Sequence, residues 1–146
     1  MRQRCDPAPG YTVSAPGLPP ARRTDLGRAQ TAAAVVGKLM LQHCGVCAAV
    51  QYPPREVCCN CLSDALHWQE TDNLGTVLAA VALQRSLEPY FQAQAPWLLG
   101  SVKLDCGPVV LLQLTEDCAM TGSRVQVTQL IDASGEAVLV ARADDE

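Results

Sequence analysis

The pattern of hydrophobic and polar positions changes twice along the chain. Residues 1–20 hold five of the ten prolines and no apolar run, which predicts a flexible, Pro-rich arm over 1–23. From Thr24, a residue that can cap a helix, the sequence is rich in Ala and Leu, so we expect a helix over 24–42. After the cysteine-rich segment 43–66, the apolar residues fall in short runs that are typical of strands.

Turns that contain glycine separate these runs. Short strands joined in this way favour a small closed barrel over a parallel sheet, so we predict a mainly β chain that ends in a five- or six-stranded barrel over 67–146. The expected strands cover 66–70, 75–84, 98–104, 109–114, 124–131 and 137–141.

Among the candidate functional residues, the cysteines have the clearest sequence spacing. Five of the eight cysteines lie between residues 44 and 61. Cys44-x-x-Cys47 and Cys58-x-x-Cys61 form two knuckles whose four thiolates suit a tetrahedral zinc ion. A shell closed by four thiolates leaves no position for substrate, so we expect structural zinc; free cysteines buried in a core are the alternative. Cys59 would then be a spare thiol.

The other titratable side chains show no catalytic pattern. Cys5, Cys106 and Cys118 stand alone and are expected to be small hydrophobes or surface thiols. We expect His43 and His67 to be solvated. No activated serine, Cys–His pair or open metal site is visible, so no catalytic residue is predicted and the chain is not expected to be an enzyme on its own.

Charge and length exclude several classes of protein. The 146 residues contain no apolar run long enough to span a membrane and no secretory signal, which predicts a cytoplasmic protein without membrane contact. Residues 1–40 carry six bases and two acids, whereas 41–146 carry five bases and thirteen acids. Such an acidic body opposes nucleic-acid binding, which stays the least favoured alternative.

Three of the six aromatic residues, Tyr90, Phe91 and Trp97, lie in one long connection between strands. Aromatic side chains dominate interface hot spots, so we interpret these as contacts to a partner or to coenzyme A; packing over a barrel mouth is the alternative. Arg55, between the knuckles, could reach a coenzyme A phosphate or could pair with Glu56 or Glu70.

Short motifs run from the end of the expected helix into the expected barrel, at residues 37–39, 42–47, 52–55, 58–61, 75–77, 96–97, 101–107 and 122–125. Through these motifs the chain resembles the small acyl-CoA-associated proteins made of an N-terminal helix, a rubredoxin-like zinc ribbon and a C-terminal OB-fold. It departs from that family at His43, where Arg is common, at Ala48, where Gly is usual, and at Cys59, where Pro is usual.

The resemblance implies a non-catalytic subunit that bridges thiolase-fold or ketosynthase-like condensing enzymes in an acyltransferase complex using acyl-CoA-type thioesters. A subunit of an acyl-CoA aldolase or hydratase complex, and a stand-alone acyl-CoA-binding protein, are the alternatives. The sequence does not identify the acyl group, the acceptor or the stoichiometry.

Overall fold

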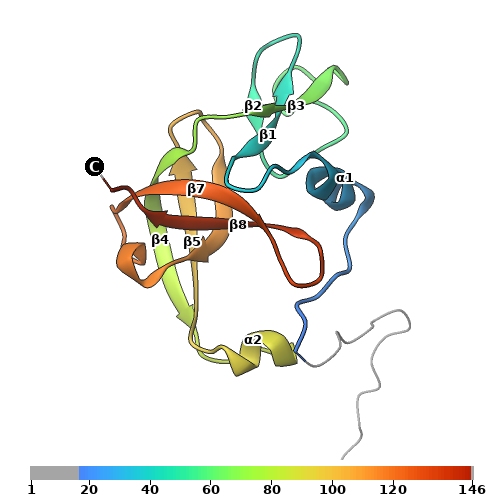
Figure 1. The fold of residues 1–146 in the computed structure, drawn as a ribbon. Helices are drawn as coiled ribbons and strands as arrows, with labels where there is room; N and C mark the ends of the chain where they lie inside the picture. The colour runs from blue at the N-terminus through green and yellow to red at the C-terminus, as the bar shows by residue number, and fades with distance from the viewer. Residues whose placement is uncertain (1–16, 146) are drawn as a thin grey trace, which may run out of the picture.

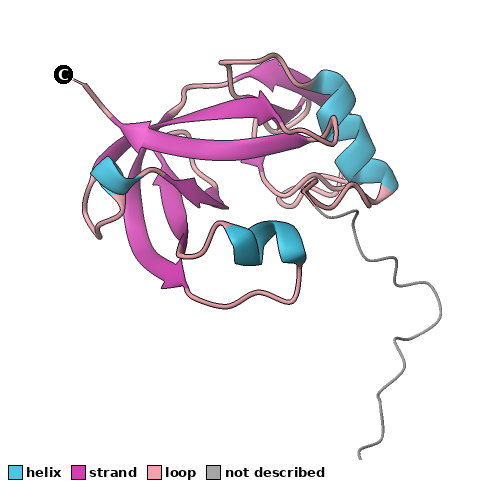
Figure 2. Ribbon diagram, turned by 60° about the horizontal axis from the view of Figure 1, so that its bottom comes forward, coloured by secondary structure: helices cyan, strands magenta, loops and turns pink. Residues whose placement is uncertain are grey.

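The computed structural model describes residues 17–145. In it, a small three-stranded sheet that carries the cysteine knuckles, called the ribbon, stands on one end of a β-barrel (Figure 1). The mainly β class expected from the pattern of short apolar runs is confirmed, and most of the described chain is strand or loop (Figure 2). None of the described helices is both long enough and apolar enough to cross a bilayer. The elements are α1 (Asp25–Ala33), β1 (Met40–Cys44), β2 (Val50–Gln51), β3 (Leu66–Glu70), β4 (Leu74–Leu83), α2 (Pro89–Ala93), β5 (Trp97–Leu104), β6 (Val109–Leu114), the 3-10 turn η1 (Glu116–Cys118), β7 (Arg124–Ile131) and β8 (Ala137–Ala143).

The N-terminal helix is shorter than the sequence predicted. Thr24 caps it, accepting a hydrogen bond from the Gly27 N–H at 3.1 Å, but the helix ends at Ala33 rather than near residue 42. Gly37 takes a positive φ of 83°, which turns the chain, and β1 begins three residues later. Residues 40–42 are strand because β1 pairs along its whole length with β3, a contact between distant segments that the local Ala and Leu content does not register.

The ribbon sheet has the order β2-β1-β3, with all strands antiparallel. Cys44 lies opposite Leu66 and Met40 lies opposite Glu70, so β3 belongs to the ribbon sheet throughout. The expected boundary at residue 66 therefore falls at the start of a ribbon strand, not between the ribbon and the barrel.

The barrel closes in the order β4-β5-β6-β8-β7. Its interior is filled by Val and Leu from every strand, including Val77, Val102, Leu112 and Val127, all below 5% exposed. Gly100 lets β5 approach its neighbours β4 and β6 closely. A Cβ atom at this position would meet the Leu114 side chain at 2.5 Å and the Ala79 carbonyl at 2.8 Å.

The ribbon and the barrel share one core. Leu39 and Leu41, at the start of the ribbon, are each 1% exposed and belong to the barrel's hydrophobic cluster. Gln129 of β7 fastens the connection, because its side-chain oxygen accepts from the Met40 N–H at 2.9 Å and its backbone bonds both Gly37 and Lys38. This linkage fixes the direction in which the cysteine knuckles project.

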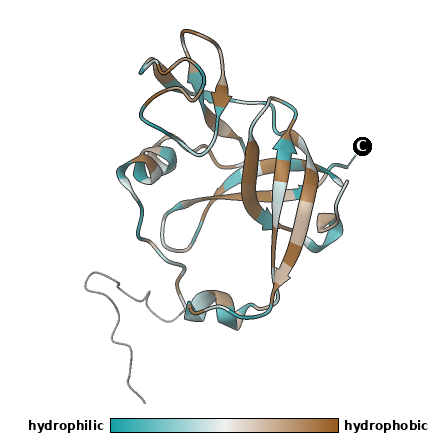
Figure 3. Cartoon of the chain, turned by 180° about the vertical axis from the view of Figure 1, so that it is seen from behind, coloured by the Kyte–Doolittle hydropathy of each residue, from teal (hydrophilic) through white to brown (hydrophobic). Residues whose placement is uncertain are grey.

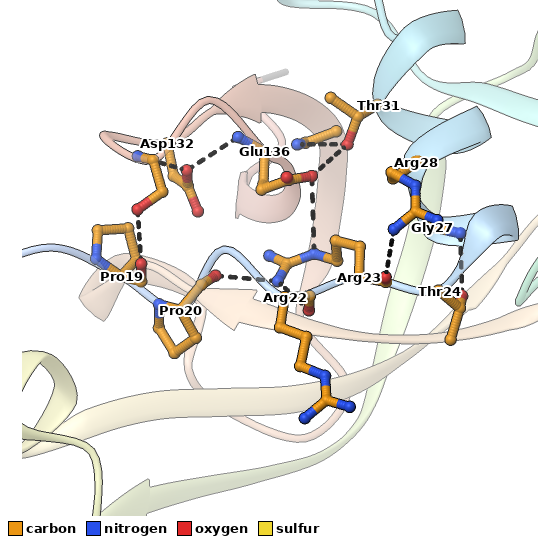
Figure 4. A network of polar contacts seen from close by, with 12 residues as sticks. Pro19, Pro20, Arg22, Arg23, Thr24, Gly27, Arg28, Thr31, Asp132 and Glu136 are labelled. Atoms are coloured by element: carbon orange, nitrogen blue, oxygen red, sulfur yellow. Dashed lines mark hydrogen bonds and ion pairs between the residues drawn. The ribbon is translucent and has the colours of Figure 1, made fainter. Parts of the chain in front are cut away.

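The described N-terminal segment is held against the turn between β7 and β8 (Figure 4). Ser134 donates to the Pro19 carbonyl at 2.5 Å, and the Arg23 guanidinium lies 3.9 Å from the Glu136 carboxylate. Thr31 of α1 donates to the same carboxylate at 2.9 Å. The flexible arm expected over 1–23 is thus wrong for the part from Pro19 onwards, while residues 1–16, and Cys5 with them, lie outside the described residues.

Candidate metal centre and aromatic groove

The four knuckle cysteines converge at the tip of the ribbon. Their Sγ atoms all lie within 4.8 Å of one another, with Cys44 and Cys61 at 3.5 Å and Cys47 and Cys58 at 3.5 Å. Cys44 and Cys58 are buried, and Cys59 is exposed outside the cluster. Four sulfur donors gathered in this way form the kind of site that binds zinc structurally.

The two knuckles repeat the same local geometry. In the first, the Val46 N–H donates to the Cys44 Sγ at 3.4 Å; in the second, the Asn60 N–H donates to the Cys58 Sγ at 3.4 Å. Hydrogen bonds to sulfur stabilise the thiolate, which is the form that ligates metal. Both turns therefore present a cysteine ready to bind a cation.

The acidity of the thiols also fits a cation site. The Asn60 side chain, followed by the Ala49 backbone N–H, lowers the pKa of Cys47 to about 6. Backbone N–H groups of Cys47 and Val46 lower the pKa of Cys44. The Ser63 backbone N–H acts in the same direction on Cys61, but burial and hydrogen bonds to the other thiols outweigh it and raise the pKa of Cys61 to about 12. Packed thiolates repel each other, and a bound dication removes that repulsion, so the donor set fits zinc.

Two buried glutamines brace the segment between the knuckles, a feature that sequence reasoning missed. The Gln42 side-chain oxygen accepts from the Arg55 N–H at 2.8 Å and from the Gln51 amide at 2.9 Å, while its own amide donates to the Arg55 carbonyl at 3.0 Å. Gln51 accepts from the Cys59 N–H at 2.8 Å. These bonds hold Arg55 against β1 and the second knuckle, at Cys59, against β2. The sequence did contain a signal for this bracing, because Gln42 is a polar residue next to Met40 and Leu41 in β1.

Arg55 is therefore anchored by its backbone, and its side chain is exposed. Glu70, one of the two carboxylates considered for it, bonds Lys38 at 2.8 Å instead. Arg55 does not line the groove that Tyr90, Phe91 and Trp97 border.

His43 departs from the solvated state expected of it. It is half-buried, and its Nε2 lies 2.7 Å from the Thr71 hydroxyl. Burial, together with the nearby His67, lowers its pKa. His67 is exposed. Of the lone cysteines, Cys118 is buried in the core and Cys106 is half-buried.

Tyr90 and Phe91, on α2, form one cluster with Trp97, the first residue of β5, on the outer side of the barrel. Phe91 contacts Trp97 edge-to-face with ring centroids 4.9 Å apart, and Tyr90 lies 5.2 Å from Phe91 and 6.2 Å from Trp97. All three are half-buried, and none belongs to the buried core. The three rings line the same groove as Pro19, Pro20 and Arg23, which lie about 70 residues earlier in the sequence.

These rings form one wall of a groove of about 550 Å³. Pro19, Pro20 and Arg23 form another wall, and Tyr52, from the hairpin between the knuckles, reaches it as well. Burial raises the pKa of Tyr52. The groove thus joins the N-terminal segment, the ribbon and the outside of the barrel.

The fold and the cysteine cluster define a protein that combines a rubredoxin-like zinc ribbon with an OB-fold. Residues 31–67 match the model of the ChsH2 rubredoxin-like zinc ribbon domain, and residues 68–129 match that of the ChsH2 C-terminal OB-fold domain. The chain carries both domains in this order and belongs to the ChsH2 family. The resemblance seen in the sequence, including its structural zinc, is confirmed at this level.

Among solved structures, the chain is similar to one described as the Ltp2-ChsH2(DUF35) aldolase. The TM-score is 0.65 with 22% sequence identity, over 86% of this chain and 98% of that chain. At this identity the likeness shows the fold. The comparison with curated proteins finds no match.

Proposed function

We propose that this chain is the non-catalytic subunit of a hetero-oligomeric enzyme that acts on acyl-CoA-type thioesters. In this proposal Cys44, Cys47, Cys58 and Cys61 hold a structural zinc ion, which keeps the ribbon folded on the barrel. The catalytic residues belong to a thiolase-fold partner, as the family resemblance implies.

The observation that carries the proposal is the half-exposed aromatic cluster beside the groove. Tyr90, Phe91 and Trp97 are large, rigid side chains that stay partly in contact with solvent, as anchor residues do before a partner covers them. Val and Leu already fill the barrel interior, so the three rings are not needed as its core.

The similar solved structure favours the aldolase alternative over acyl transfer and hydration. That protein is an aldolase, Ltp2-ChsH2(DUF35). We therefore favour a partner that makes or breaks a carbon–carbon bond next to an acyl thioester, which was the alternative to acetyl transfer.

We also propose that Arg55 contacts a phosphate of the thioester substrate's coenzyme A. Its backbone is fixed by Gln42 while its guanidinium is exposed, so the side chain can reach a ligand held by the partner. Arginine suits this role because its planar fork matches phosphate oxygens.

The test is to isolate the tagged chain from its native host and to identify stoichiometric partners by mass spectrometry. A thiolase-fold enzyme is the expected partner, and the purified complex should cleave or form an aldol product of an acyl-CoA. Acetyl transfer without aldol activity would restore the acyltransferase alternative. Recovery of the chain alone, or with nucleic acid, would contradict the proposal.

A further inference from the structure

The second half of β4 has an open edge. On one side β4 bonds β5 as far as the Leu83–Trp97 pair, but on the other side it pairs with β7 only over residues 74–76. The last bonds on that side join Val77 to Ser123 and Gly122, at 3.0 and 2.8 Å. Beyond Val77, no strand in residues 17–145 pairs with this edge. Figure 3 shows it as the outer margin of the sheet, running down to α2.

This edge lacks the features that keep strand edges from associating. All six residues of 78–83 are exposed and apolar, with Val81 at 53%. No charged residue and no proline occurs between Asp72 and Arg85. Soluble proteins usually protect an open edge with lysine, proline or a covering loop, because its free N–H and C=O groups bind another strand. The chemistry of the edge thus calls for an uncharged, extended segment as its partner.

The edge is also complementary to itself. The register with β5 places Ala79, Val81 and Leu83 on the outer face of the sheet, opposite Ser101, Leu99 and Trp97. Ala80 lies opposite Gly100, and Ala82 lies opposite Leu98, on the inner face. Across a two-fold axis, antiparallel strands pair residues of the same face. With the axis at Val81, each Leu83 would meet an Ala79 and each Ala80 an Ala82.

We propose that this β4 edge pairs with the same edge of a second copy of the chain, which joins two barrels in one continuous antiparallel sheet. The pairing sets large side chains against small ones and puts no like charges opposite each other. A nucleic acid would instead meet an uncharged edge on an acidic body. The homodimer does not depend on the function proposed above, because it uses the chain alone.

The first experiment measures the mass of the purified, zinc-loaded full chain by sedimentation equilibrium from micromolar to submillimolar concentration. The wild type should approach twice the 15.6 kDa of one chain. Val81→Lys brings two ammonium groups together at the axis and should raise the dimer dissociation constant at least tenfold, by a rough estimate for like charges in a strand pair. Leu111→Lys, at an apolar site on β6 that is even more exposed than Val81, is the control and should remain a dimer.

An introduced charge pair tests the register in which the two β4 edges pair. Restoration of the dimer by a second substitution also separates a lost interface from a folding defect. Ala79→Lys alone should weaken the dimer, and Ala79→Lys with Leu83→Glu should restore it, since each new lysine faces the new glutamate of the other copy. Within one chain the two sites lie roughly 13 Å apart along the strand, too far to pair directly. Circular dichroism verifies that each variant is folded. A monomeric wild type, a Val81→Lys variant that still dimerises, or a double variant no tighter than Ala79→Lys would overturn the proposal.

Discussion

Ala48 and Leu62 occupy equivalent positions in the two cysteine knuckles, and both have left-handed backbone conformations, with φ of 62° and 61°. Each directly follows the second cysteine of its knuckle. The Ala48 N–H donates to the Cys44 carbonyl at 3.0 Å, and the Leu62 N–H donates to the Cys58 carbonyl at 3.1 Å. The turn that brings two thiols together therefore requires this conformation, even though neither residue is glycine.

Replacing Ala48 by glycine should stabilise the zinc-loaded protein. A non-glycine residue with left-handed φ costs roughly 1–2 kcal/mol, and the greater freedom of glycine in the unfolded chain offsets roughly 0.5–1 kcal/mol of that gain. We expect a net increase of up to about 1.5 kcal/mol in the free energy of unfolding, measured with a denaturant. Ala49→Gly is the control and should destabilise, because Ala49 has no positive φ. A loss of stability in both variants would contradict this account of the turn.

Removal of a zinc ligand should unfold the ribbon. Structural zinc contributes about 10–16 kcal/mol to the folding of small zinc domains, far more than the ribbon's few buried side chains can replace. Cys44→Ser and Cys61→Ser should lose the metal, measured as zinc per chain, together with the strand signal of the ribbon. The barrel should become less stable too, because Leu39 and Leu41 belong to its core.

Cys59→Ser is the matched control for these ligand variants. Its thiol is exposed and lies outside the cluster, so the variant should bind one zinc ion as the wild type does. Loss of zinc from this variant, or a folded and metal-free Cys44→Ser protein, would show that the ligand set is wrong.

Local signals explain why much of the fold and the metal centre could be predicted. The two knuckles are visible because ligand spacing is a property of the chain itself, and the barrel strands are visible because Val and Leu come in short runs between turns. The end of α1 was predicted wrongly, since residues 40–42 become strand only through their pairing with β3. The bracing of Arg55 by Gln42, and the placement of Trp97 and Pro19 in one groove, depend on how distant segments pack, which no local pattern records.

The ion pair between Asp105 and Arg124 should make part of the stability depend on pH. The carboxylate accepts two hydrogen bonds from the guanidinium, at 2.9 and 2.7 Å, and these bonds lower the pKa of Asp105. A group with a lowered folded pKa stabilises the protein above its unfolded pKa, about 3.9. This contribution is lost as the pH falls from there through the folded pKa.

Asp105→Asn should therefore be less stable than the wild type at neutral pH, and the difference should vanish in acid below the folded pKa. Because both side chains are nearly half exposed, the difference should also shrink in high salt. Thermal unfolding at several pH values measures it, with Asp64→Asn in the ribbon as a control for loss of a carboxylate. A difference that persists in acid would assign the effect to packing instead.

Phe91→Ala and Trp97→Ala should separate partner binding from folding. The rings contact each other and line the groove, but they lie outside the buried core, so each truncation should cost roughly 1–2 kcal/mol of stability, less than for a fully buried aromatic residue. As interface anchors they should weaken binding of the partner enzyme by 2 kcal/mol or more, about thirtyfold. Binding is measured by titrating the separated partner subunit, with Met120→Ala, an exposed apolar site outside the groove, as the control. A variant that unfolds would show that the cluster belongs to the core, and a folded variant with unchanged affinity would remove the groove from the interface.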